Sequence, residues 1–408
     1  MSLPRPALLT LRLMAAAAIL AASNLSGQTD ADAVRPFWGI GSPGGRANGL
    51  AQAYTGIADD ATALTFNPAG LAHLTRGEFN ISLGHTKATT EITNPSYPSS
   101  TSISATRLGN LGLVLPLPGT RFTWAAAYQQ VRAYDRRRVL SFEPDSLIPY
   151  RHTETITEKG TMGAFSVGIA YQASPQLAIG GSLDLLIGNN DYTETTNFPT
   201  QPESDDYVII KPDYNGFNIG LGLMLAPIPQ WRLGLLLRTP QKINIEELYD
   251  DVTLEDWETY NYSARSSYYL RGGSSLTLGP WLVAADIYWF DYSQIEFESD
   301  LYDGDIPLDL EINQTLRSSY RSITGWAVGG ELLLSDFNIK LRGGYRLDPN
   351  FFRPNGSGAD QQTVALGFSV VPVPALKLDF TYTYTTWKSN NYEHLSAGNL
   401  ALGLVYRL

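Results

Sequence analysis

Positively charged side chains in the second half of the chain recur at alternating positions, as expected of residues on one face of a β-sheet. They are Arg232, Arg238, Lys340, Arg342, Arg346, Lys377 and Arg407. A cation in a largely apolar cavity can bind the carboxylate of an amphipathic small molecule. We select Arg342 and Lys377 as the candidate ligand-binding residues. The alternative is a hydrated interior in which acidic groups such as Asp286 and Asp379 balance the charges.

Other chemistries have little support in the sequence. The chain has no cysteine, so disulfides and cysteine-bound metals are excluded. The histidines are scattered without metal-ligand spacing, at His73, His85, His152 and His394. No G-x-S-x-G motif occurs, and Gly39, Gly41 and Gly44 match G-x-G-x-x-G without the strand and helix that nucleotide binding requires. We therefore predict no catalytic residue, no metal site and no cofactor.

The composition favours a wall that faces a medium less polar than water. Of the 408 residues, 17% are charged and 11% are aromatic, whereas a typical soluble protein has roughly 25% charged residues. The net charge is −11. Nucleic acid is therefore excluded as a partner, because binding phosphates requires clustered Lys and Arg.

The first residues have the pattern of a secretory signal peptide. Arg5 and Arg12 precede the apolar run 13–22, and small and polar residues follow. We assign residues 1–27 to the signal peptide, with cleavage between Ser23 and Gln28. No cysteine follows, so the exported chain is not a lipoprotein. Elsewhere no apolar run reaches the length of about 20 residues that a membrane helix needs, and only a closed barrel could then span a membrane.

Residues 77–408 alternate between apolar and polar positions with a period of two. In 376–385, for example, one face carries Leu376, Leu378, Phe380, Tyr382 and Tyr384. We count strands near 77–88, 104–117, 119–133, 160–173, 176–190, 214–226, 230–240, 263–279, 281–294, 321–335, 337–347, 362–371, 375–387 and 396–408. Tight turns alternate with long polar connections at 134–159, 191–213, 241–262 and 295–320. This alternation predicts an all-β fold, a 14-stranded antiparallel transmembrane β-barrel, rather than a soluble sandwich.

Residues 28–76 do not alternate and precede the barrel. Asp59 or Asp60 can cap one short helix, and Asn67 can cap another that has Pro68 at its first position. A barrel of this size has a wide lumen. We therefore expect 28–76 to fold as a hatch, a plug segment inside the barrel.

The run GRANGLAQAYTGIADDATALTFNPAGLAHL, residues 45–74, closely resembles the hatch of the FadL/TodX family of outer-membrane transporters for hydrophobic compounds. The Asn-Pro-Ala motif lies at Asn67, Pro68 and Ala69. Weaker similarity continues through the strands. The resemblance implies a monomeric barrel that takes up long-chain fatty acids or other apolar molecules. It also implies a lateral opening beside a kinked third strand that the hatch motif touches.

The third strand departs from the family in its composition. Residues 119–134 carry Ala125, Ala126 and Ala127 where glycines would favour a kink. The lateral opening therefore rests on the resemblance alone.

We accordingly expect a passive uptake channel for hydrophobic small molecules in the bacterial outer membrane, in contact with membrane lipids and lipopolysaccharide. An alternative is a PorV-like component of a protein secretion system, because aromatic connections such as 241–262 would also suit protein partners. A plain diffusion pore is the third interpretation, and steady conductance in planar bilayers would support it.

Overall fold

The computed structural model describes residues 29–39, 41, 44–94, 97–144, 150–303, 306–353, 359–388 and 393–408. The predicted signal peptide, residues 1–27, lies outside the described residues. The predicted division into a hatch at 28–76 and a barrel at 77–408 stays a prediction as to its limits.

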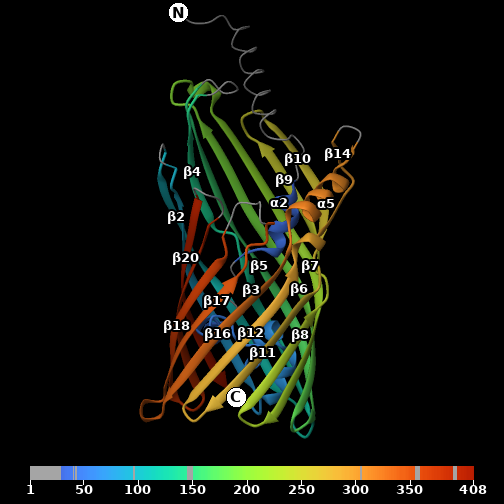
Figure 1. Cartoon of the computed structure of the whole chain (residues 1–408), viewed down its shortest axis with the longest axis vertical. Helices are drawn as coiled ribbons and strands as arrows, with labels where there is room; N and C mark the ends of the chain where they lie inside the picture. The colour runs from blue at the N-terminus through green and yellow to red at the C-terminus, as the bar shows by residue number, and fades with distance from the viewer. Residues whose placement is uncertain are drawn as a thin grey trace, which may run out of the picture.

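The described chain forms a closed barrel of fourteen antiparallel strands (Figure 1). Four of these are interrupted and carry two labels each: β3/β4, β8/β9, β10/β11 and β12/β13. The strands are β1 Glu78–Ile92, β2 Ser99–Pro116, β3 Phe122–Ala133, β4 Arg136–Phe142, β5 His152–Ser174, β6 Leu177–Asn197, β7 Asp206–Ile228, β8 Trp231–Arg238, β9 Lys242–Asp251, β10 Asp256–Arg265, β11 Tyr269–Leu278, β12 Trp281–Asp291, β13 Glu296–Ser299, β16 Ser322–Leu334, β17 Ile339–Asp348, β18 Gln361–Val373, β19 Leu376–Lys388 and β20 Glu393–Arg407. Pairing of β20 with β1, from Glu78 opposite Arg407 to Ile92 opposite Glu393, closes the barrel. The predicted fold class is confirmed.

One end of the barrel has tight turns, such as those at Gly119 and Gly279, whose φ angles of 74° and 59° favour glycine. In outer-membrane barrels this end faces the periplasm. The opposite end carries the small hairpin of β14 Tyr302–Asp303 and β15 Ile306–Pro307, the helix α5 Leu308–Ser319, and the short helices η3 Pro202–Ser204 and η4 Tyr292–Gln294. The helix η5 Ser335–Phe337 lies in a tight turn.

The prediction that the long connections are loops is wrong for three of them. Much of 134–159, 191–213 and 241–262 is strand, because β5, β6, β7 and the hairpin of β9 and β10 continue far beyond the apolar wall. These extensions are rich in Thr, Tyr and Ile, which favour strands even where both faces meet water. Alternation between apolar and polar residues marks only the part of each strand that contacts lipid, so it did not reveal these extensions.

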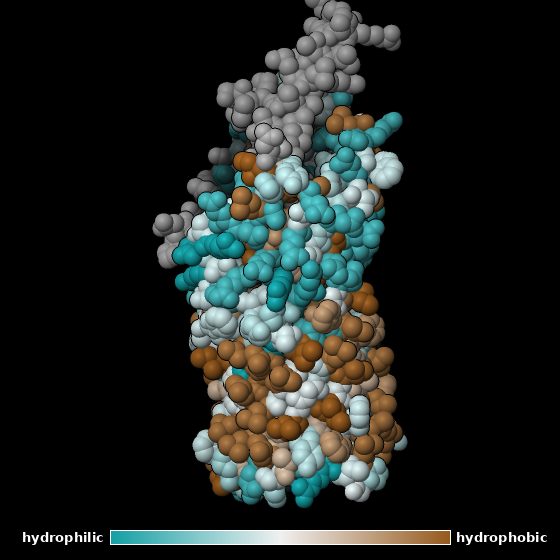
Figure 2. All heavy atoms as spheres, turned by 90° about the vertical axis from the view of Figure 1, so that its right-hand side faces the viewer, coloured by the Kyte–Doolittle hydropathy of each residue, from teal (hydrophilic) through white to brown (hydrophobic). Residues whose placement is uncertain are grey.

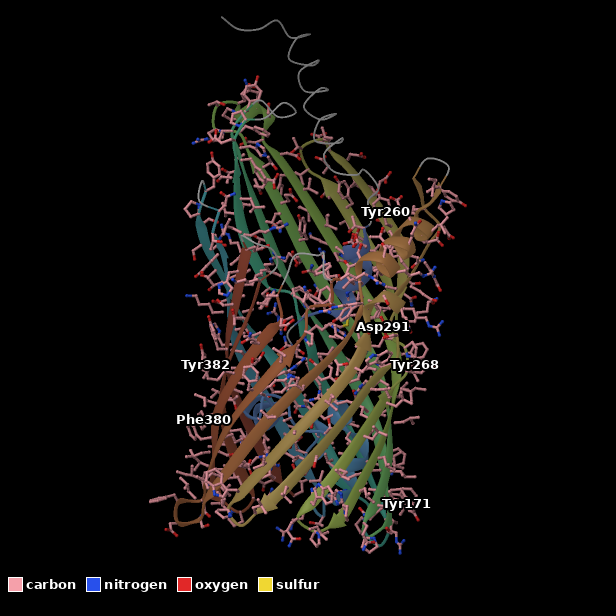
Figure 3. The ribbon with its side chains drawn as sticks, in the orientation of Figure 1. Tyr171, Tyr260, Tyr268, Asp291, Phe380 and Tyr382 are labelled. Carbon is pink, nitrogen blue, oxygen red and sulfur yellow. The ribbon has the colours of Figure 1, made fainter. Side chains whose placement is uncertain are left out.

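The outer surface divides into two zones (Figure 2). On the face shown, an apolar band covers the periplasmic half, and a polar surface covers the half beyond it. Aromatic side chains mark the edges of the band. Figure 3 places Tyr268 and Tyr382, both about half exposed, on opposite sides at a similar height, and Tyr171 near the periplasmic end. The outward position predicted for Tyr382 and Tyr384 is confirmed.

The described residues before β1 lie inside the barrel (blue in Figure 1). It contains the short helices α2 Asp30–Val34, η1 Arg35–Phe37, α3 Gly45–Gly49, α4 Ala63–Phe66 and η2 Pro68–His73. Tyr54, Phe66 and Leu50 are among the largest fully buried side chains, so much of the hydrophobic core lies between hatch and wall. Among the described residues, no helix is long and apolar enough to cross a membrane.

Candidate functional site

Asn67 joins three parts of the molecule. Its Oδ1 accepts a hydrogen bond from the Ala69 amide at 3.2 Å and caps η2, as its position before Pro68 predicts. Its Nδ2 donates to the carbonyl of Thr55 at 3.2 Å and to that of Leu223, on β7, at 3.0 Å. Asn67 is fully buried. The side chain therefore fixes the hatch both to itself and to the wall.

Glycines in the wall allow the Asn-Pro-Ala motif to lie directly against the strands. A Cβ atom on Gly180 would lie 2.5 Å from the Ala69 nitrogen, and one on Gly222 would lie 2.3 Å from Asn67 Oδ1. On Gly234 it would lie 2.1 Å from the Thr55 carbonyl oxygen. Backbone approach this close is possible only where the side chain is absent.

The opposite side of the hatch is held by buried ion pairs. Arg46 of α3 pairs with Asp59 in the hatch, and its Nε lies 3.0 Å from Glu331 Oε2 on β16. Glu331 also binds Arg342 Nε at 2.7 Å and Lys340 Nζ at 2.9 Å. One wall carboxylate thus accepts from three cations, one of them from the hatch.

The candidate residues Arg342 and Lys377 both belong to this network. Arg342 is fully buried, and its guanidinium also binds Asp379 at 2.7 Å. Lys377 Nζ lies 3.3 Å from the same carboxylate. Both residues line a cavity of about 170 Å³ near the periplasmic turns, which we call the inner cavity. The charges of both residues are balanced by the neighbouring acids Glu331 and Asp379. That they bind a ligand carboxylate stays a prediction.

A second anchor holds residues 52–55 of the hatch. The carboxylate of Asp286, on β12, accepts from the Tyr54 and Thr55 amides at 3.1 and 3.0 Å and from the Thr55 hydroxyl at 2.6 Å. Arg271, on β11, donates to the same carboxylate at 2.9 Å and also to the Gln52 carbonyl. Asp286 thus balances a wall cation and fixes the hatch at once.

A larger cavity of about 590 Å³ lies on the extracellular side of the hatch, and we call it the outer cavity. Its volume falls within the range of about 300–1,000 Å³ typical of ligand pockets. Hatch residues Val34, Phe37 and Gln52 contribute to its lining, as do wall residues such as Ala88 and Tyr288. The cavity can therefore hold a small molecule between hatch and wall.

Aromatic rings crowd the extracellular side of the outer cavity. Phe351 stacks on Tyr292 with ring centroids 4.5 Å apart, and it also contacts Tyr320 and Trp38. Trp38 makes an edge contact with Trp387 on β19 at 6.0 Å. Hatch and wall both supply rings, so this surface is suited to apolar molecules.

The barrel wall has a seam beside this cavity. The backbone pairing of β2 with β3 stops at Asn110 opposite Gln129. Further out, only side chains join β2 to β4 among the described bonds: Ser99 Oγ donates to the Val139 carbonyl at 2.7 Å and Thr101 Oγ1 to the Arg137 carbonyl at 2.6 Å. An ion pair between Arg107 and Asp135 spans the interval.

On the far edge of the seam, β3 has a bulge at Val131. Gln130 pairs with Gly163 and Arg132 with Met162, so Val131 is an extra residue relative to β5. Residues 130–136 line the outer cavity. The family resemblance implies a kink in this strand, and the structure shows a bulge there, without a glycine or proline to signal it.

Two hatch glycines lie against this bulge. A Cβ on Gly41 would lie 2.4 Å from the Val131 carbonyl oxygen, and one on Gly39 would lie 3.2 Å from that of Ala133. Gly39 and Gly41 therefore allow the hatch backbone to lie directly against the bulge. The helix η2, which begins at Pro68, packs against β3 as the resemblance implies, and also against β5, β6 and β7, while Asn67 itself binds to β7.

Sequence reasoning missed Arg132 and Tyr134 in the lining of the outer cavity. One signal was available. Uninterrupted alternation from Phe122 and Trp124, which are exposed on the outer face, would place Arg132 toward lipid. A charge on the lipid-facing side of a strand is destabilising to a degree that depends on its depth, so the arginine itself indicated a break in phase.

A closed fourteen-stranded barrel with an apolar outer band and a lumen filled by an anchored hatch defines an outer-membrane transport protein. Residues 43–404 match the model of the family described as outer membrane protein transport protein (OMPP1/FadL/TodX). The chain belongs to this family, and it is a protein of the bacterial outer membrane.

Solved structures share the fold. A FadL homologue from Pseudomonas aeruginosa has 13% sequence identity and a TM-score of 0.63, with 90% of this chain and 99% of that chain covered. The Ralstonia pickettii toluene transporter TbuX has 14% identity and a TM-score of 0.62, with 91% and 98% covered. The monoaromatic hydrocarbon channel CymD has 17% identity and a TM-score of 0.58, with 90% and 98% covered. No curated protein sequence matches significantly.

Proposed function

We propose that the protein is a passive uptake channel for hydrophobic small molecules, of which long-chain fatty acids are the leading class. The observation that carries this proposal is the outer cavity, which is lined partly by aromatic side chains and adjoins the seam in the wall. Family membership supports transport over the PorV-like secretion interpretation. The protein works as a monomer among outer-membrane lipids and lipopolysaccharide, and transport involves no covalent chemistry.

The proposed route follows the geometry. A molecule enters among the aromatic rings around Phe351, occupies the outer cavity, and leaves through the seam between β2 and β3. Below the cavity, the hatch is tied to the wall by Asn67, Asp286 and Glu331. Exit through the seam requires no displacement of these buried bonds, whereas a path through the lumen would break them.

A cavity-filling variant tests the use of the outer cavity. Ala88 lines the cavity and Leu83, on the same strand, is exposed on the outer face. We expect Ala88→Trp to reduce uptake of radiolabelled hexadecanoate about tenfold or more in a bacterial host that lacks its own fatty-acid channel, because the ring occupies ligand space. Leu83→Trp should leave uptake unchanged. Equal uptake by Ala88→Trp and the wild type would refute the proposal.

A second variant tests the lateral exit. Asp135→Asn weakens the ion pair that spans the seam, and we expect uptake to rise a few-fold because the seam then separates more readily. The matched control is Glu298→Gln, since Glu298 forms an exposed ion pair with Lys242 away from the seam. Unchanged uptake with Asp135→Asn would favour exit through the lumen.

A further inference from the structure

One arginine of the outer cavity lacks a counter-charge. The other arginines of the lining each pair with a carboxylate: Arg35 with Asp32, Arg136 with Glu393, Arg238 with Asp184, Arg271 with Asp286 and Arg346 with Asp348. For Arg132, the structure shows no ion pair within the described residues. Its Nη atoms donate to Met162 Sδ and to Gln241 Oε1, both at 3.2 Å. Both acceptors are uncharged, and thioether sulfur is a weak one.

A second polar group of the same lining is also unsatisfied. Tyr134 is 7% exposed, and its hydroxyl has no hydrogen-bond partner among the described residues. Leaving a buried hydroxyl or a buried charge without a partner is costly. Such a group in a cavity wall indicates a ligand atom that completes it.

The bulge at Val131 brings these two groups to one face. Arg132 lies opposite Met162, which is fully buried on the inner face of β5. Tyr134 follows two residues later, and alternate residues of an extended chain point the same way. A guanidinium and a hydroxyl on one face can donate together to the two oxygens of a single carboxylate.

Resting on the proposed function, we infer that Arg132 and Tyr134 bind the carboxylate head group of an amphipathic ligand, so that the channel selects fatty-acid-like monoanions over neutral hydrocarbons. A neutral hydrocarbon would leave both groups unpaired. The head group then lies at the edge of the seam, and the apolar tail lies in the remaining cavity. Arg342 and Lys377, which are neutralised by Glu331 and Asp379, do not supply this selectivity.

The test compares one chain length with three head groups. Purified protein in mild detergent is titrated with hexadecanoate, methyl hexadecanoate and hexadecane, and retained probe is measured by mass spectrometry of organic extracts. We expect the wild type to bind hexadecanoate about tenfold or more tightly than the ester. Arg132→Gln and, independently, Tyr134→Phe should reduce hexadecanoate binding, Arg132→Gln about tenfold or more, with hexadecane binding unchanged.

The matched control is Arg137→Gln, which removes an exposed arginine of β4 and should change none of the three affinities. Heat-modifiable gel mobility reports whether each barrel is folded, and Tyr134→Phe keeps the test decisive if Arg132→Gln does not fold. Equal binding of acid and ester by the wild type, or unaltered acid binding by the folded variants, overturns the inference and leaves the uptake function standing. Failure of all three probes to bind the wild type overturns both.

Discussion

The two halves of the hatch are held in different ways. Residues 44–76 are tied to the wall by Asn67, by the carboxylates of Asp286 and Glu331, and by close contacts with wall glycines. Residues 29–41 instead pack through Val34 and Phe37 against aromatic and aliphatic side chains around the outer cavity. Residues 44–76 therefore form a fixed floor beneath the outer cavity, whereas residues 29–41 border the cavity and the seam. Retention in the lumen and ligand handling are therefore assigned to different stretches of one segment.

The largest expected effect comes from breaking the buried ion pairs around Glu331 that hold residues 44–76 in place. Arg342→Met leaves Glu331 and Asp379 buried with one cation fewer, and loss of one partner of a buried ion pair costs about 3–5 kcal/mol. We expect a clear fall in the thermal unfolding midpoint, followed by heat-modifiable gel mobility, and a rise in planar-bilayer conductance as the hatch loosens.

The control for this variant is Arg265→Met, because Arg265 is about half exposed and lies 4.0 Å from Glu296. Its loss should cost at most about 1 kcal/mol. If Arg342→Met keeps the wild-type midpoint but loses hexadecanoate binding, Arg342 does not stabilise the hatch. The predicted ligand contact at Arg342 then gains support.

A smaller effect is expected from crowding the Asn-Pro-Ala contact. Gly180→Ala forces a methyl group to within 2.5 Å of the Ala69 nitrogen, whereas at the neighbouring Gly181 the atom nearest to such a methyl group would be 3.8 Å away. Overpacking of this kind costs about 1–3 kcal/mol. Denaturant unfolding of the pair should therefore show destabilisation for Gly180→Ala and none for Gly181→Ala. Identical midpoints would mean that the hatch gives way at this contact.

The smallest effect concerns the outer half of the hatch. The Tyr320 hydroxyl donates to Asp30 Oδ2 at 2.8 Å and joins the residue after α5 to α2. Burial and the nearby Asp30 carboxylate raise the pKa of Tyr320 above its usual value, so the hydroxyl stays protonated at neutral pH. Tyr320→Phe should weaken this contact by about 1 kcal/mol.

Hydrogen exchange can detect so local a change. Amides of residues 30–38 should exchange several-fold faster in Tyr320→Phe, while those near Asn67 stay unchanged. Tyr302→Phe is the control, because Tyr302 is 67% exposed. Faster exchange across the whole hatch would show that its two halves are coupled rather than independent.

The sequence predicted the features that depend on local patterns. Alternation gave the fourteen strands, and the Asn67–Pro68 pair gave the cap of η2, because each depends on a few neighbouring residues. The convergence of Arg46, Lys340 and Arg342 on Glu331 could not be predicted, since it depends on how hatch and wall meet. The inward position of Arg132 was missed because a single bulge shifts the phase of alternation without changing composition.

The bulge at Val131 also bears on how such a barrel can change over evolutionary time. Loss of this bulge, with Val131 taking a regular place in the β-ladder, would restore unbroken alternation and turn Arg132 and Tyr134 from the lumen toward the lipid. The gain or loss of one bulge can thus exchange a whole set of cavity side chains, which would otherwise require several separate substitutions. Descendants of a common barrel can in this way acquire new preferences for cargo while every residue type stays the same.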